Sequence, residues 1–426
     1  MSAHTALERR RPAAIRRATT RCSFWVALTL AGGPALAAPM TEAELIRDYL
    51  DGPVAGAELR AVEARAASQG TGPAALPNPE LEARHEAARG PAGATTDAIG
   101  GAVSLDLGFS ALAERAAAGL RGDAGERWQR AATVSAACEL RGAALAHWSA
   151  SEQSAVAGSA QARLDDLTDA LGSLAEAGEV SAYTRDRAAL TASAHRAAAA
   201  ASLGEALRSQ AQLSGLLGGA VDSVQLAPIG PLPALEDAVE GALSEHPALA
   251  ALRLERDAAA RSEAASRRAA APDLRVSAGA RWDAPVDGEA SPGYEIGGAL
   301  ELPLFDWSRA DVRASVADSA AIEARIARAE AAALSAVEGA WRRADALGAA
   351  GEGPLDPEAI WRAARTRYVG GEASLDELLQ VAQDVESALL AHIEAERLLR
   401  AAHLDLDCAV GRFHAPGLQS VLEDRQ

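Results

Sequence analysis

Three side chains near the C-terminus, those of a histidine, an aspartate and a cysteine, are of types that could bind a metal ion. His403, Asp407 and Cys408 are types that ligate transition metals, and His403 and Asp407 are four residues apart, on one face of a helix. His392 is eleven residues before His403, about 16 Å along a helix, which is too far to share an ion. A loose cluster of this kind is usual where a helix surface meets a packing seam. The sequence therefore predicts no metal site.

Catalytic and cofactor-binding patterns are also missing from the sequence. It contains no G-x-S-x-G, no H-E-x-x-H, no phosphate-binding loop and no dinucleotide fingerprint. Met40 is the only methionine after the leader described below, so no methionine-rich copper(I) path exists. We predict that the protein is not an enzyme and needs no cofactor.

Two short turn motifs carry the clearest local signal. They are Gly178-Glu-Val-Ser181 and Gly371-Glu-Ala-Ser374, and 193 residues separate them. Glycine permits the backbone angles of a tight reversal, and serine is a favourable N-cap for a helix that follows. Each motif predicts a reversal between two helices.

The same spacing recurs elsewhere in the chain. Asn78-Pro-Glu-Leu81 recurs as Ala271-Pro-Asp-Leu274, and Ala57-Glu-Leu-Arg60 recurs as Ala250-Ala-Leu-Arg253, both at an offset of 193. Leu105-Asp-Leu107 corresponds to Leu300-Glu-Leu302 at an offset of 195, as a small loop insertion would give. Such agreement predicts a tandem duplication. The boundaries that we expect are a first repeat at 38–217, a linker at 218–233, a second repeat at 234–413 and a tail at 414–426.

Both repeats then follow one plan, mainly helical with a small β part. We expect, in order, a helix, a strand, a polar loop, a second strand, a long helix, the turn and a returning helix. The expected ranges are 42–69, 79–86, 87–98, 99–108, 110–176 and 182–217 in the first repeat, and 234–269, 272–281, 283–293, 294–304, 307–367 and 375–412 in the second.

The long helices determine the architecture. Sixty-seven residues at 110–176 would measure about 100 Å, and such a helix can bury its apolar stripe only along other helices, as in a coiled coil. The apolar content of 49% with only 4% aromatic residues agrees with thin, alanine-lined seams. In the second repeat, glycines and prolines at Gly351, Gly353, Pro354 and Pro357 should kink or break the helix.

The N-terminus has the pattern of a secretion signal. Six arginines precede a short apolar run, and an A-x-A motif ends at Ala37, so we expect residues 1–37 to be a cleaved signal peptide. Its removal takes away a net charge of +5, so the formal charge changes from −18 to about −23. This acidity disfavours nucleic acid as a partner. For Cys138 and Cys408, two buried free thiols are the favoured interpretation, and a disulfide is the alternative.

The strands are uneven in character. Aromatic residues flank the second pair, as in an interfacial girdle: Trp282, Tyr294, Phe305 and Trp307. The first pair has almost no aromatic residues, and its first strand is highly polar through Glu80, Glu82, Arg84, His85 and Glu86.

The run from Leu302 to Arg309, the alanine-rich helix after it and the run from Arg367 to Leu379 resemble the outer-membrane efflux channel (TolC-like) family, most closely its heavy-metal efflux branch. The resemblance covers roughly residues 41–413. It implies a homotrimer in the outer membrane, in which four strands per subunit form a twelve-stranded barrel in lipid and the helices form a periplasmic tunnel. It further implies a periplasmic adaptor protein and an inner-membrane pump as partners, and passive export of metal ions or small molecules. A type I protein secretion channel and a periplasmic coiled-coil structural protein remain the alternatives.

The resemblance also implies roles for individual residues. The adaptor-contact tips would be Gly178, Glu179, Val180, Ser181, Gly371, Glu372, Ala373 and Ser374. Asp376 would lie at the pore constriction and form a ring of three carboxylates that attracts cations. The position 193 residues earlier is Tyr183, and Leu379 replaces a second acid of the family, so this ring is not doubled. A solvated carboxylate at a helix start is the alternative role of Asp376.

Overall fold

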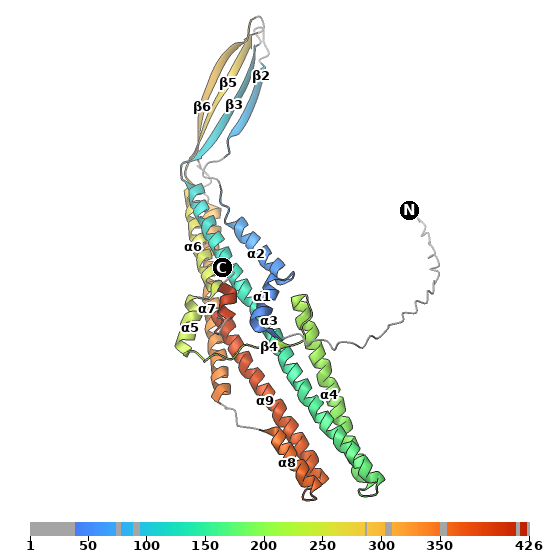
Figure 1. The fold of residues 1–426 in the computed structure, drawn as a ribbon. Helices are drawn as coiled ribbons and strands as arrows, with labels where there is room; N and C mark the ends of the chain where they lie inside the picture. Colours follow the sequence, from blue (N-terminus) through green and yellow to red (C-terminus); the bar gives the residue numbers. More distant parts are fainter. Residues whose placement is uncertain are drawn as a thin grey trace, which may run out of the picture. The chain divides into compact units, whose positions relative to one another are not determined.

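The computed structural model describes residues 39–73, 78–87, 94–285, 288–302, 309–349, 356–414 and 418–423. Most of these residues are helical, and one antiparallel sheet contains the four long strands (Figure 1). The expected signal peptide, Phe305, Trp307 and three of the four breaker residues at 351–357 lie outside the described residues.

The sheet has the strand order β2-β3-β5-β6. Its strands are β2 (Glu80–Ala87), β3 (Ala94–Asp106), β5 (Asp273–Pro285) and β6 (Ser291–Glu301). The existence of all four strands is confirmed, but several expected bounds were wrong. β3 begins five residues earlier and β5 ends four residues later than expected, because these two strands pair with each other over their whole length, from Ala94↔Pro285 to Asp106↔Asp273. Only the pairing of the two hairpins creates this extension.

The passage from β3 into the first long helix is capped by the last residue of the strand. Phe109 adopts a left-handed φ of 56° and offers no side-chain cap. Asp106 caps instead, because its carboxylate accepts hydrogen bonds from the Gly108 N–H at 2.8 Å and the Ala111 N–H at 3.1 Å. The strand end thus satisfies backbone donors of the first helical turn.

The long helices agree closely with expectation. α3 (Ser110–Glu176) and α4 (Ala182–Leu217) have the expected bounds. α9 (Leu375–Val410) ends two residues early, since Gly411 adopts a φ of 80° and terminates it. The expected helix 307–367 appears as α7 (Arg309–Ala349) and α8 (Pro357–Val369), in agreement with the predicted break.

The shorter helices correct the sequence analysis, because each expected single helix is two helices. Residues 42–69 form α1 (Glu42–Asp51) and α2 (Ala55–Gln69), with Pro53 between them. Residues 234–269 form α5 (Leu235–Ser244) and α6 (Pro247–Arg268), which has proline at its first position. A proline lacks the N–H that an interior helical position donates, so it ends one helix and can begin the next.

The linker and the tail also contain structure that the sequence analysis missed. In the linker, β4 (Val224–Gln225) pairs in parallel with β1 (Met40–Thr41). In the tail, α10 (Leu418–Glu423) packs into a core beside α1 and α3. That core contains leucine and isoleucine from α1, α3, α4 and α10: Leu45, Ile46, Leu140, Leu213 and Leu418. Within the described ranges, no helix is both long enough and apolar enough to cross a membrane.

Candidate functional site

The four-stranded sheet has one polar and one apolar face. Residues directly opposite each other on neighbouring antiparallel strands share a face, so the registers assign every side chain. The polar face carries acids, arginines and small residues, including Glu80, Glu82, Arg84, Glu86, Ser104, Arg275, Ser277, Arg281, Asp283, Glu295 and Glu301.

The opposite face is apolar and exposed. It carries, among others, Leu81, Ile99, Val103, Leu105, Leu274, Val276, Trp282, Tyr294, Ile296 and Leu300. In the single chain the exposed fractions are 84% for Leu81, 81% for Tyr294 and 74% for Ile296. A contiguous face of large apolar side chains in contact with water marks a surface that meets an apolar environment.

This arrangement explains the polar strand of the sequence analysis. In β2 the side chains of Glu80, Glu82, Arg84 and Glu86 all lie on the polar face. Leu81, Ala83 and His85 lie on the other face, where His85 Nδ1 is 2.5 Å from Asp97 Oδ1 of β3. The polar residues of β2 therefore do not interrupt the apolar face along most of the strand.

Ion pairs connect the two hairpins across the polar face. Arg275 of β5 reaches across β3 and pairs with Glu80 at 2.9 Å and with Glu82, both on β2. Gly100 and Gly279 lie opposite each other on this face, where a Cβ on Gly279 would be 2.9 Å from the Gly100 Cα. The close approach of these strands thus requires the absence of side chains at both positions.

Both predicted turns reverse the chain between helices. Gly178 and Gly371 have φ of 76° and 73°, in the left-handed region that glycine adopts readily. Ser181 Oγ accepts a hydrogen bond from the Thr184 N–H at 3.1 Å. Ser374 forms a full capping box with Glu377. The sequence signals for the turns and their caps were correct.

The side chains of these turns are available to a partner. Glu179 and Glu372 are exposed, and Val180 and Ala373 are half-buried. A Cβ on either turn glycine would have open space within 4 Å. The two turns therefore form exposed helix tips. Glycine is required there by the backbone conformation and not by close packing.

Asp376 is paired within its own chain. Arg187 Nη1 on α4 lies 2.6 Å from Asp376 Oδ1 on α9. A second cross-helix pair joins His195 Nδ1 and Glu386 Oε2 at 2.8 Å, and there both side chains are nearly buried. Sequence reasoning missed Arg187 because it lies far from Asp376 in the sequence, in a segment with no local signal for the contact.

A hydrophobic cluster holds the same helices together near the tips. It joins buried side chains of α3, α4, α8 and α9: Leu164, Ala192, Trp361, Leu378, Leu379 and Ala382. Leu379, at the position where the resemblance implies an acid, belongs to this cluster. A carboxylate there would be buried without a known partner, so leucine suits the site as built.

The cysteines and the candidate metal ligands are arranged differently from expectation. Cys138 and Cys408 form a disulfide with a Cα–Cα distance of 6.1 Å, so the favoured interpretation as free thiols was wrong. The two residues are 270 positions apart, and only the packing of α3 against α9 brings them together. Cys408 is therefore not a metal ligand, and the residues that the structure describes contain no group of three His, Cys, Asp or Glu side chains fit to hold an ion.

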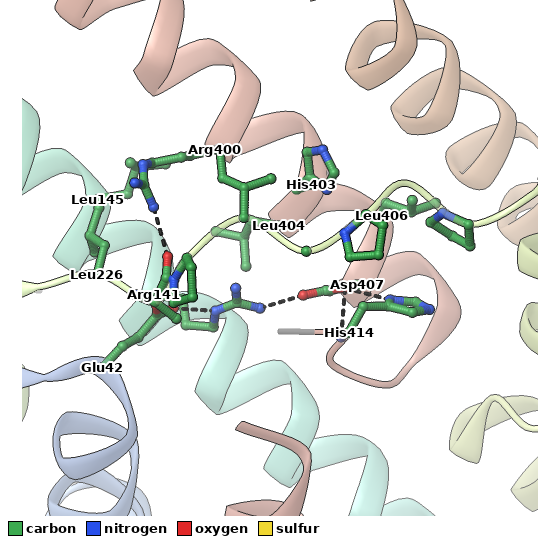
Figure 2. Close-up of a pocket in the computed structure, with 16 residues that line it drawn as sticks. Glu42, Arg141, Leu145, Leu226, Arg400, His403, Leu404, Leu406, Asp407 and His414 are labelled. Carbon is green, nitrogen blue, oxygen red and sulfur yellow. Dashed lines mark hydrogen bonds and ion pairs between the residues drawn. The ribbon is translucent and has the colours of Figure 1, made fainter. Parts of the chain in front are cut away.

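Asp407, which precedes the disulfide residue Cys408, belongs to a buried ion network. Figure 2 shows this network with Glu42, Arg141 and His414. Arg141 of α3 lies between Glu42 of α1 and Asp407 of α9, with 2.8 Å from Arg141 Nη1 to Asp407 Oδ2. Asp407 also contacts His414 Nδ1 at 2.7 Å. Burial by itself would lower the pKa of Arg141, but Glu42 and Asp407 raise it above its usual value, so the guanidinium stays charged.

Similarity to known proteins is concentrated in the second half of the sequence and extends over the fold. Residues 238–412 match the sequence profile of the family described as outer membrane efflux protein. No curated protein is significantly similar in sequence.

Several solved channels share the fold. The outer membrane protein VceC from Vibrio cholerae has a TM-score of 0.70 at 17% identity, over 87% of this chain and 96% of that one. The CmeC outer membrane channel of Campylobacter jejuni has 0.67 at 15% identity, over 87% and 85%. The MtrE outer membrane channel of Neisseria gonorrhoeae has 0.66 at 18% identity, over 89% and 90%.

These matches confirm the predicted resemblance in sequence for residues 238–412 and in fold for the described chain, while assignment to the heavy-metal branch stays a prediction. The described chain has the fold of solved outer-membrane channels, and its residues 238–412 carry the sequence pattern of the outer membrane efflux protein family.

Proposed function

We propose that this protein is the outer-membrane channel of a tripartite efflux system, a passive conduit from the periplasm to the exterior. The observation that carries the proposal is the sheet with one apolar and one polar face, connected to helices of up to 67 residues. An apolar face suits lipid and a polar face suits water, so such a sheet can form the wall of a pore.

Closure of that wall requires further copies. Four strands are too few to enclose a pore, whereas three chains supply twelve. Along the strand order, β2 and β6 run in opposite directions, so β6 of one chain would pair with β2 of the next in the antiparallel manner of the other pairs. A homotrimer satisfies the backbone groups of both edges.

The strands are long enough for a bilayer. The 13 residues of β5 extend about 43 Å, or about 30–35 Å when tilted by the usual 35–45°, which exceeds an apolar band of about 25 Å. Trp282 and Tyr294 lie on the apolar face near the hairpin ends, where an aromatic girdle belongs.

The helix tips supply the partner surface. The segments Gly178–Ser181 and Gly371–Ser374 are exposed, and we propose that they contact a periplasmic adaptor, which couples the channel to an inner-membrane pump. The Arg187–Asp376 pair joins the first turns of α4 and α9, close to both tips. We propose that this pair belongs to the closed constriction, and that adaptor binding must separate it for export of metal ions or small molecules.

The expected cellular location agrees with this function. A disulfide between Cys138 and Cys408 is stable in an oxidising compartment, as the periplasm is. The arginine-rich leader supports the same export route.

Two aspartate substitutions on β6 test which face meets lipid. Ile296→Asp places a charge on the apolar face, where it should oppose insertion by less than the about 2–4 kcal/mol that Arg or Lys costs at the bilayer midplane, in each of three chains. Trimers in the outer membrane and conductance in planar bilayers should therefore both fall. Ala299→Asp adds the same group three residues away on the polar face, and this variant should insert and conduct. Equal insertion and conductance of the two variants would show that the sheet does not face lipid as proposed.

A further inference from the structure

The disulfide joins the two halves of the chain at one point of the helical part. Cys138 lies in the middle of α3 and Cys408 lies in the last turn of α9. Both residues are half-buried. The far end of α9 is the tip at Ser374, which the exposed Arg187–Asp376 pair holds to α4. The bond therefore ties down one end of α9, whose other end is attached by non-covalent contacts, the Arg187–Asp376 pair and the hydrophobic cluster around Leu378 and Leu379.

The two cysteines border a groove and are not sealed in a core. The groove has a volume of about 550 Å³. Its lining is mostly apolar and comes from α2, α3 and the start of α6, including Val62, Trp128, Ala132, Val134 and Pro247. Thiol–disulfide exchange requires a thiolate to reach a sulfur atom, and a bond beside a groove permits that approach.

The ion network keeps the helices together independently of the bond. Arg141 is one turn after Cys138, and Asp407 directly precedes Cys408. Their contact at 2.8 Å, together with the contact of Arg141 with Glu42, crosses the same seam between helices. After reduction these contacts would hold the two thiols close, so that closure stays an intramolecular reaction.

We propose that Cys138–Cys408 is a reversible redox clasp, closed after export by a thiol–disulfide oxidoreductase that enters this groove. One cysteine thiolate attacks the disulfide of the oxidoreductase and forms a mixed disulfide, and the second cysteine thiolate then displaces the enzyme. Two electrons and two protons pass to the partner, which leaves as a dithiol. Reduction by a dithiol runs through the same steps in reverse and removes the covalent link between α3 and α9, so that only non-covalent contacts, including the ion network, hold them together.

Thiol counting on the assembled protein in detergent tests the clasp without reference to transport. Dithiothreitol without denaturant should expose two further maleimide-reactive thiols per chain, while the assembly stays intact. The measured quantity is the difference between the thiol counts with and without dithiothreitol. Cys22, in the leader, would add one thiol to both counts if the leader were retained. Oxidised glutathione should then restore the bond through a mixed disulfide that mass spectrometry detects. Release of the two thiols only in denaturant would overturn the proposal and leave a purely structural cross-link.

A substitution of Arg141 tests the role of the ion network in re-closure of the disulfide. In Arg141→Gln the two helices lose their charged bridge, so we expect re-closure by oxidised glutathione to slow about tenfold as the effective concentration of the thiols falls. Arg208→Gln is the matched control, since Arg208 pairs with Glu205 on the exposed side of α4. Re-closure of an assembled Arg141→Gln protein at the wild-type rate would contradict the role of the network. If this variant does not assemble, the thiol counts of the wild-type protein decide by themselves.

Discussion

At the scale of single residues, the structure changes what Asp376 can do. An unpaired carboxylate would add a full negative charge to a constriction, but the guanidinium of Arg187 at 2.6 Å neutralises it in the described chain. Both side chains are about half exposed, so solvent screens the pair and its contribution is small, about 0.5 kcal/mol. A contact of this strength could be separated by the binding of a partner, as the proposed function requires.

Exchanging the two charges distinguishes two roles of Asp376: an ion pair with Arg187 that keeps the constriction closed, and a carboxylate ring that selects cations. Asp376→Asn should weaken three pairs per trimer, about 1.5 kcal/mol in total, and raise the open fraction in planar bilayers roughly tenfold. The double variant Arg187→Asp, Asp376→Arg should restore closure, because the pair is rebuilt with exchanged charges. Glu377→Gln is the control, since Glu377 caps its own helix. A loss of cation preference that the double variant does not restore would instead favour the carboxylate ring.

At the scale of elements, small residues set the distance between α2 and α3. A Cβ on Gly125 of α3 would lie 2.3 Å from the Ala66 Cβ and 2.7 Å from the Ala66 Cα on α2. Backbone atoms cannot yield as a long side chain does. The absence of one methyl group therefore fixes how closely the two helices pack.

Alanine substitutions at two glycines of the same helix test this contact. Gly125→Ala should destabilise the assembled protein by about 1–3 kcal/mol through overpacking, measured as a lower Tm. Gly142→Ala, where a Cβ meets nothing within 4 Å, should keep or raise the Tm because alanine favours helix by up to about 1 kcal/mol. An unchanged Tm for Gly125→Ala would show that α2 is not held at this distance in the assembled protein.

At the scale of the whole molecule, three histidines are held in their neutral form. Burial lowers the pKa of His147, His246 and His403 below the usual value. A histidine whose pKa is lower in the folded than in the unfolded state contributes stability above its unfolded pKa of about 6.5, and this stability is lost as pH falls through the folded value. These three residues should therefore make the protein sensitive to acid.

Thermal unfolding against pH measures the effect. The Tm of the wild-type protein should fall between pH 7 and pH 5 more steeply than that of a variant with His147→Gln, His246→Gln and His403→Gln. His392→Gln, at an exposed position of α9, should follow the wild-type profile. The comparison is between profiles, so the groups that are unchanged in the triple variant contribute equally to both. Parallel profiles for the wild type and the triple variant would contradict the role of buried histidine.

The sequence by itself determined the features that depend on neighbouring residues. The reversals at Gly178 and Gly371, the bounds of α3 and α4 and the four strands follow from glycine angles, serine caps and local periodicity, which act within a few residues. The break between α1 and α2 at Pro53 is also a local feature that the sequence could predict. The sequence analysis did not predict it because the apolar pattern continues across Pro53.

Only the tertiary structure decided which distant residues meet. The pairing of β3 with β5 set their lengths, and the pairing of β2 with β3 placed Glu80, Glu82, Arg84 and Glu86 on one face. The packing of α3 against α9 made a disulfide from cysteines 270 residues apart. Arg187 found Asp376 in the same way. The physical reason is that such contacts depend on helix rotation and strand register over the whole chain, and no preference within a short segment encodes either of them.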